Sequence, residues 1–232
     1  MTEQHAADPA PEPVDQPADE GPGWMPAILA GTLLMAIIGF LFCGFSTWIL
    51  FQKRTELAIR TLRGSYLPAL EQSLLAPEDK RAVVQRIETL AMDMERGKFE
   101  DWQAAAVMQR LQRLPVLQWG ELAAVEAVIA KSEIEEKSQA VEQLSRLRRA
   151  VELGKVTSFD VEDALQPVLV DDENALSGRS LVRPMEAAAA REVVHRAKLL
   201  ADRSGVPDQS FEVDLDQIIQ REIDVATQQG GY

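Results

Sequence analysis

The sequence predicts an all-α protein in which one transmembrane helix precedes a bundle of amphipathic helices. Two observations support this fold class: an uncharged run from Trp24 to Phe51, and apolar residues that recur with the helical period beyond Arg54. Only residues 167–170 and 180–182 have an extended pattern. We therefore expect at most one small β-hairpin, near 167–182, as the exception to the helical fold.

The length of the uncharged run indicates the role of the first helix. Its 28 residues would extend roughly 42 Å as a helix, whereas the hydrocarbon core of a bilayer is about 30 Å thick. A cleaved signal peptide would begin with basic residues and carry a shorter apolar stretch, and a buried helix of a soluble protein is rarely apolar over such a length. Residues 24–52 are therefore predicted to span a membrane.

Both ends of the run fit a bilayer. Trp24 and Trp48 lie where an aromatic belt would place them, and Lys53 and Arg54 mark the water boundary on one side. Basic residues follow the run closely and none precedes it, so the positive-inside rule predicts a cytoplasmic C-terminal domain and an external N-terminus.

One face of the predicted span carries small side chains. Stepping along the helix gives Ala27, Gly31, Gly39 and Cys43, interrupted by Met35. Small residues let two transmembrane backbones approach closely, which would make this row a helix–helix contact in a homo-oligomer. The alternative is that glycine and alanine are simply common in membrane helices.

The segment before the span has no means of forming a core. Residues 1–23 are rich in proline and acidic residues, hold no lysine or arginine, and contain one branched apolar residue, Val14. Such a composition predicts a disordered acidic tail.

The segment after the span, residues 53–76, is treated as a juxtamembrane region. Its basic residues either contact anionic lipid head groups or only fix the topology of the span. Glu56 and Glu71 dilute the positive charge, which favours the second interpretation.

Residues 77–232 are predicted to form the cytoplasmic helical domain. A fourth helix is expected to start at a capping box, Ser132 with Glu135, and to end at Gly154. The other helices expected in this domain cover residues 77–96, 100–114, 121–130, 185–203 and 213–227.

Composition and motifs exclude several kinds of chemistry. The formal net charge of −13 argues against a nucleic-acid partner. One cysteine and two histidines, Cys43, His5 and His195, cannot form a disulfide framework or a cysteine or histidine metal site within one chain. Gly154–Lys155 lacks the rest of a phosphate-binding loop. We therefore assign no catalytic, cofactor-binding or metal-binding residues and no cofactor.

Trp119 has two interpretations. It lies beside Gly120 in the turn-rich stretch 113–122, where buried packing is the default. An exposed Trp119 would instead be a contact for a protein partner.

The stretches FCGFSTWILFQKRTELAIRTLRGSY and RLQRLPVLQWGEL resemble those of bacterial single-pass membrane proteins with no assigned activity. The resemblance extends over most of the chain after Trp24 and implies no substrate, cofactor or site residue. Together these features predict a membrane-anchored, non-enzymatic protein whose helical domain binds an unknown protein partner. The alternative is a tethered enzymatic or regulatory domain with an unrecognised carboxylate-based site.

Overall fold

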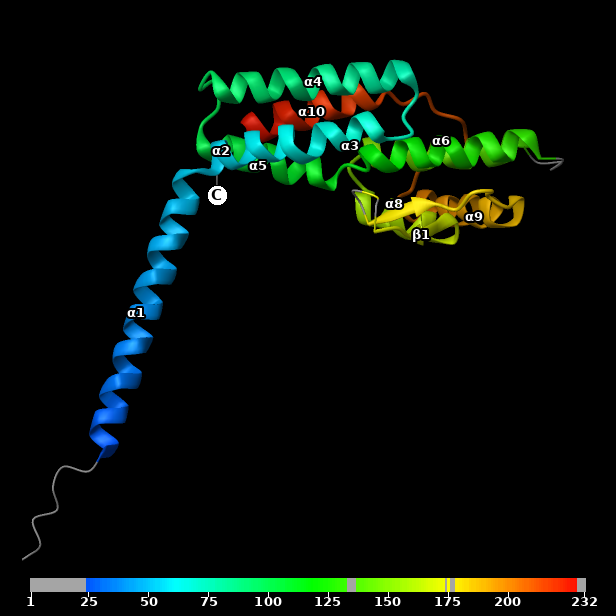
Figure 1. Ribbon diagram of the computed structural model, residues 1–232. Helices are drawn as coiled ribbons and strands as arrows, with labels where there is room; N and C mark the ends of the chain where they lie inside the picture. Colours follow the sequence, from blue (N-terminus) through cyan, green and yellow to red (C-terminus); the bar gives the residue numbers. More distant parts are fainter. Residues whose placement is uncertain (1–23, 133–136, 174, 176–177, 229–232) are drawn as a thin grey trace, which may run out of the picture. The chain divides into compact units, whose positions relative to one another are not determined.

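The structure is a computed structural model that describes residues 24–132, 137–173, 175 and 178–228. The chain divides into two compact units, of which the first ends at Ile49 and the second begins at Leu50 (Figure 1). The predicted disordered tail, residues 1–23, lies outside the described residues. The predicted fold class is confirmed, because the chain is mostly helical with one small hairpin.

Helix α1 (Trp24–Gln52) contains the long apolar run. Its segment Pro26–Trp48 is long and apolar enough for a membrane span or a signal sequence, and no part of it is buried. Large side chains such as Phe40 are therefore exposed. The hydroxyls of Thr32 and Thr47 donate to the carbonyl oxygens of Ile28 and Cys43, four residues earlier in the same helix.

The segment that follows α1 belongs to the second unit. It consists of helix α2 (Arg54–Thr61), the π-helical turn η1 (Leu62–Tyr66) and helix α3 (Leu67–Gln72). Ala58, Leu62 and Leu70 are buried in the core. The expected boundary between residues 53–76 and 77–232 therefore does not separate two parts of the fold, since this segment packs on the helices after it.

Three helices pack with this segment in the second unit: α4 (Pro77–Glu95), α5 (Asp101–Arg113) and α10 (Leu215–Gln228). Proline starts α4, where its missing N–H costs nothing, and a capping box of Glu100 with Gln103 starts α5. The last helix of the chain, α10, lies beside α4 and α5 (Figure 1). Arg86 bonds Asp216 at 2.6 Å and Arg110 bonds Glu222 at 2.6 Å across these contacts.

The second unit also contains α6 (Val116–Lys131), α7 (Lys137–Glu152), α8 (Ser158–Leu165), the 3-10 turn η2 (Gln166–Val168) and α9 (Ala187–Arg203). Helix α9 packs along α7 and also contacts α6 and α8. Helix α6 begins five residues earlier than expected, because Pro115 is its N-cap residue as well as the stop for α5.

The expected start of the fourth helix requires a correction. Ser132 is the C-cap residue of α6, and its hydroxyl donates to the carbonyl oxygen of Ile129 at 2.7 Å. The other member of the expected capping box, Glu135, lies outside the described residues.

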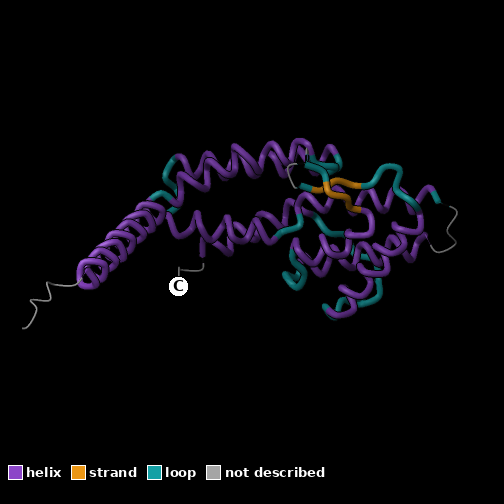
Figure 2. The backbone as a smooth tube through the Cα atoms, turned by 60° about the horizontal axis from the view of Figure 1, so that its bottom comes forward, coloured by secondary structure: helices purple, strands orange, loops and turns teal. Residues whose placement is uncertain are grey.

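The small hairpin is present where the extended pattern predicted it. Strands β1 (Leu169–Asp171) and β2 (Arg179–Leu181) pair antiparallel, with Leu169 opposite Leu181 and Asp171 opposite Arg179 (Figure 2). This hairpin covers a cavity against α6, described next.

Candidate functional site

A cavity of about 440 Å³ lies between the end of α3, the start of α6 and the hairpin. We call it the hairpin cavity. Its polar lining residues are Gln72, Ser73, Glu121, Asp172, Arg179, Ser180 and Arg183.

Glu121 is the unusual side chain of the hairpin cavity. It lies in the second turn of α6 and is only partly accessible to solvent. Burial, with a smaller contribution from the negative charge of Glu162, raises the pKa of Glu121 to about 7. Within the described chain its carboxyl makes no hydrogen bond or ion pair. A carboxyl group in this state exchanges a proton near neutral pH, which suits acid–base chemistry or recognition of a hydrogen-bond donor.

The neighbouring charges do not neutralise Glu121. Arg179 bonds Glu162 at 2.8 Å and lies 3.7 Å from Asp171. Arg183 lines the cavity from an exposed position. The hairpin side thus brings two guanidinium groups and the carboxylate of Asp172 to the cavity, while Glu121 lies on the side of α6.

A second cavity, of about 510 Å³, lies against α5. We call it the basic cavity. Its charged and aromatic lining residues are Arg54, Trp102, Arg110, Arg113 and Glu222. Arg110 bonds Glu222, whereas Arg113 is exposed and has no hydrogen bond or ion pair with any described residue.

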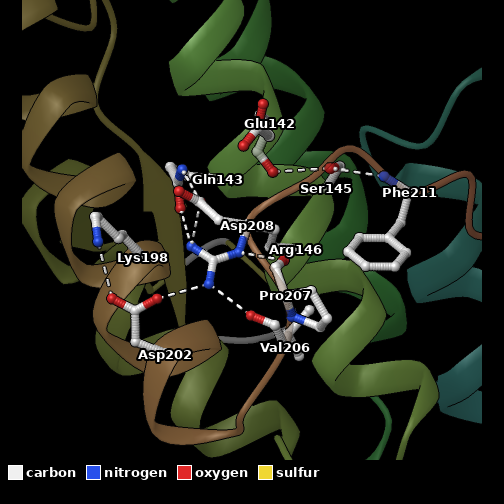
Figure 3. Close-up of polar contacts among 10 residues, drawn as sticks. All are labelled: Glu142, Gln143, Ser145, Arg146, Lys198, Asp202, Val206, Pro207, Asp208 and Phe211. Atoms are coloured by element: carbon white, nitrogen blue, oxygen red, sulfur yellow. Dashed lines mark hydrogen bonds and ion pairs between the residues drawn. The ribbon is translucent and has the colours of Figure 1, made fainter.

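The most extensive polar cluster surrounds Arg146 of α7 (Figure 3). Its side chain is 3% exposed. The guanidinium donates to side chains and backbone carbonyls at 2.5–3.0 Å, and the acceptors are Gln143, Asp202, Val206, Pro207 and Asp208. These bonds fix the loop after α9 on α7.

Asp202 contributes to the same cluster from the end of α9. Hydrogen bonds from Lys198 and from Arg146 lower the pKa of its carboxyl. The acid therefore stays ionised and keeps Arg146 paired.

Trp119 is not an exposed partner contact. Its side chain is 5% exposed, and the guanidinium of Arg148 lies 5.7 Å from the centre of its ring. The interpretation as a binding residue is thus corrected to packing. The next residue, Gly120, explains why α6 approaches so closely, because a Cβ there would lie 2.5 Å from the backbone nitrogen of Leu75.

The residues assigned to the membrane interface lie at the two ends of the apolar run. Trp24 and Trp48 are exposed on α1. Lys53 bonds Glu56 at 3.1 Å, and Arg54 lines the basic cavity.

The row of small residues on α1 is exposed. Ala27 and Cys43 are exposed, and a Cβ added at Gly31 or Gly39 would meet nothing within 4 Å. Whether a second copy packs there stays a prediction.

Sequence reasoning missed Glu121, Arg146 and Tyr66. The Tyr66 hydroxyl, in the π-helical turn η1, is buried without a hydrogen-bond partner among the described residues, and burial raises its pKa. The π-helical turn itself leaves no mark in the residue pattern.

Among the residues that the structure describes, no three His, Cys, Asp or Glu side chains gather as a metal site would require.

No known protein family, curated protein or solved structure matches this chain. The assignment of function therefore depends on the residues and their geometry.

Proposed function

We propose that this protein is a single-pass membrane protein whose cytoplasmic helical domain binds other proteins and carries out no catalysis itself. The observation that carries the proposal is the apolar segment Pro26–Trp48 of α1, of which no part is buried and which is joined directly to a packed helical domain. The exposure of so much apolar surface on one helix is unfavourable in water and favourable in lipid.

The polar groups of α1 also support a lipid environment. In a bilayer every hydrogen-bonding group must be satisfied internally. The hydroxyls of Thr32 and Thr47 meet this requirement by bonding carbonyl oxygens of their own helix. The orientation rests on Lys53, Arg54 and the basic residues after them, which favour a cytoplasmic domain.

Exposed apolar side chains support the interaction role. Phe159 on α8 is 75% exposed, and Leu199 on α9 is 50% exposed. The two helices pack together, and the bond from Arg196 to the carbonyl oxygen of Asp163 joins them. Aromatic residues are frequent at the energetic centre of protein interfaces, so Phe159 is the residue expected to anchor a partner.

Two measurements test this proposal. A reporter enzyme that is active only in the cytoplasm, fused after Tyr232, should be active, and a reporter that works only outside should be silent at the same point. Affinity purification in mild detergent should recover a partner with the natural chain but not with Phe159→Ser. Phe99→Ser is an unsuitable control because Phe99 packs against the core, so Met92→Ser, at 38% exposure on α4, serves instead.

Reversed reporter activities would overturn the orientation. A set of partners that is unchanged by Phe159→Ser would remove Phe159 from the interface.

Glu121 favours a second candidate, a tethered domain with a carboxylate-based site. Its unpaired, partly buried carboxyl faces a cavity large enough for a small molecule. A thermal-shift screen of small amines and guanidines on the full chain tests this candidate. Compounds that stabilise the natural protein but not Glu121→Gln would support a ligand site. Compounds that stabilise both proteins equally would exclude Glu121 from it.

A further inference from the structure

We infer that the basic cavity binds the phosphate group of an anionic phospholipid. The inference depends on the proposed membrane anchoring and adds a ligand class and a set of residues to it. Three features support this inference: an arginine that has no partner among the described residues, the short distance along the chain from the span to the cavity, and the tryptophan in the cavity wall.

The first feature is the guanidinium group of Arg113. Arg54, Arg110 and Arg113 line the basic cavity, and Glu222 is the one carboxylate among its described lining residues. Glu222 already accepts from Arg110 at 2.6 Å and lies 3.6 Å from Arg221. Arg113 has no hydrogen bond or ion pair with the described residues, so its donors can turn to a ligand. The planar fork of arginine matches two oxygens of a phosphate group.

The second feature is the covalent distance from the apolar run. Arg54 follows Trp48 by six residues. Six residues advance roughly 9 Å as a helix, and even a fully extended chain would cover only about 20 Å. The head-group layers add roughly 5–8 Å to each side of the hydrocarbon core. If α1 spans the bilayer, chain connectivity alone therefore keeps one wall of the basic cavity near the lipid phosphates.

The third feature is Trp102. It lines the cavity from the first turn of α5, is partly buried, and donates its indole N–H to Glu100. Tryptophan has an apolar ring with one polar edge and is enriched at the level of lipid head groups. The same short distance favours a lipid over a soluble phosphate, because the membrane presents its head groups at high local concentration.

Native mass spectrometry of the full chain in mild detergent tests the inference. The protein is first reconstituted in lipid nanodiscs, which checks that it inserts. It is then given equal amounts of phosphatidylglycerol and phosphatidylcholine in detergent. We expect more bound phosphatidylglycerol than phosphatidylcholine. Arg113→Gln should reduce this preference about fivefold, as expected for the loss of one partly exposed charge-assisted hydrogen bond. Arg113→Lys should keep part of it.

Arg203→Gln is the matched control, since Arg203 is an exposed arginine of α9 outside the cavity. It should bind lipid as the natural chain does. A second arm adds inorganic phosphate at millimolar concentration. If phosphate displaces the lipid completely, the ligand is a soluble anion and the lipid assignment is wrong.

The remaining outcomes separate this inference from the proposed function. A chain that inserts into nanodiscs but binds both lipids equally overturns only the inference. An equal loss in Arg113→Gln and Arg203→Gln would mean that general surface charge, and not this cavity, attracts the lipid. A chain that fails to insert would overturn the membrane anchoring and the lipid site together.

Discussion

Nη2 of Arg146 lies 2.6 Å from Oδ1 of Asp202, and this ion pair joins the middle of α7 to the end of α9. The two ends of the pair differ in environment. Arg146 is 3% exposed, whereas the side chain of Asp202 is 43% exposed. The arginine therefore depends on its partners far more than the acid does, because water can solvate the acid if the pair breaks.

Arg146→Met should destabilise the domain by about 3 kcal/mol. Methionine fills part of the space but leaves Gln143 and the carbonyl oxygens of Val206 and Pro207 without their donor. Urea unfolding of the full chain in detergent, followed by circular dichroism, measures the loss. Lys198→Ala removes the other cation that bonds Asp202 and should cost less than about 1 kcal/mol, because that pair is exposed. Equal losses in the two variants would refute the structural role of Arg146.

Gly120→Ala should destabilise the domain by about 2 kcal/mol or more. The added methyl group would meet the backbone of Leu74 and Leu75, which cannot rotate away as a side chain can. The melting temperature of the full chain measures the effect. Gly64→Ala is the matched control, since a Cβ there meets nothing within 4 Å. Alanine also suits a helix better than glycine by roughly 0.5–1 kcal/mol, so Gly64→Ala should be neutral or stabilising.

The raised pKa of the Glu121 carboxyl predicts that the stability of the domain depends on pH. The pKa of its carboxyl rises from 4.5 to about 7 on folding, so between these values the folded chain binds more protons than the unfolded chain. Stability must then fall as pH rises through this window. Glu121→Gln removes the cost of ionising the buried group. At pH 8 this variant should be more stable than the natural chain by about 2 kcal/mol, after allowance for the solvent that reaches the side chain.

The advantage of Glu121→Gln should shrink as the pH falls towards 5. Urea unfolding at several pH values follows it. Glu88→Gln, at an exposed position of α4, is the control for the replacement of one glutamate by glutamine. A difference for Glu121→Gln that stays constant with pH would show that the pKa of its carboxyl is not raised.

The small-residue row of α1 predicts self-association in the membrane. Gly31→Ile together with Gly39→Ile would place two branched side chains in the contact, so the signal of a membrane two-hybrid assay should fall. Insertion should not change, because isoleucine is apolar. Leu33→Ile with Leu41→Ile, on another face of the helix, is the matched control. If both pairs give the natural signal, the glycines play no part in association.

The helical period was sufficient to predict most of the fold. It placed α4, α5, α9 and α10 close to their observed bounds, because each has a stripe of buried apolar residues and clear end signals. It failed at Ser132, where one serine can end a helix or begin the next, and at Pro115, which does both. The order of residues alone does not distinguish these roles.

The candidate site could not be predicted from the sequence for a different reason. Glu121 resembles any exposed glutamate of a helix until the hairpin, more than 45 residues later, closes over it. Apart from Gln143 of the same helix, the partners of Arg146 lie 56–62 residues away in the chain. Burial of a charged group depends on such distant segments, and a local pattern contains no record of them.

The position of α10 beside α4 and α5 has a consequence for synthesis. A ribosome delivers the helices in order, so α4 and α5 emerge long before the segment that covers them. Until residues near Asp216 and Glu222 appear, Arg86 and Arg110 lack these carboxylate partners and the apolar faces of both helices stay open. A nascent chain already inserted in a membrane would thus hold its unfinished domain at the bilayer surface. Shielding by lipid or by a chaperone during that interval would protect the exposed core.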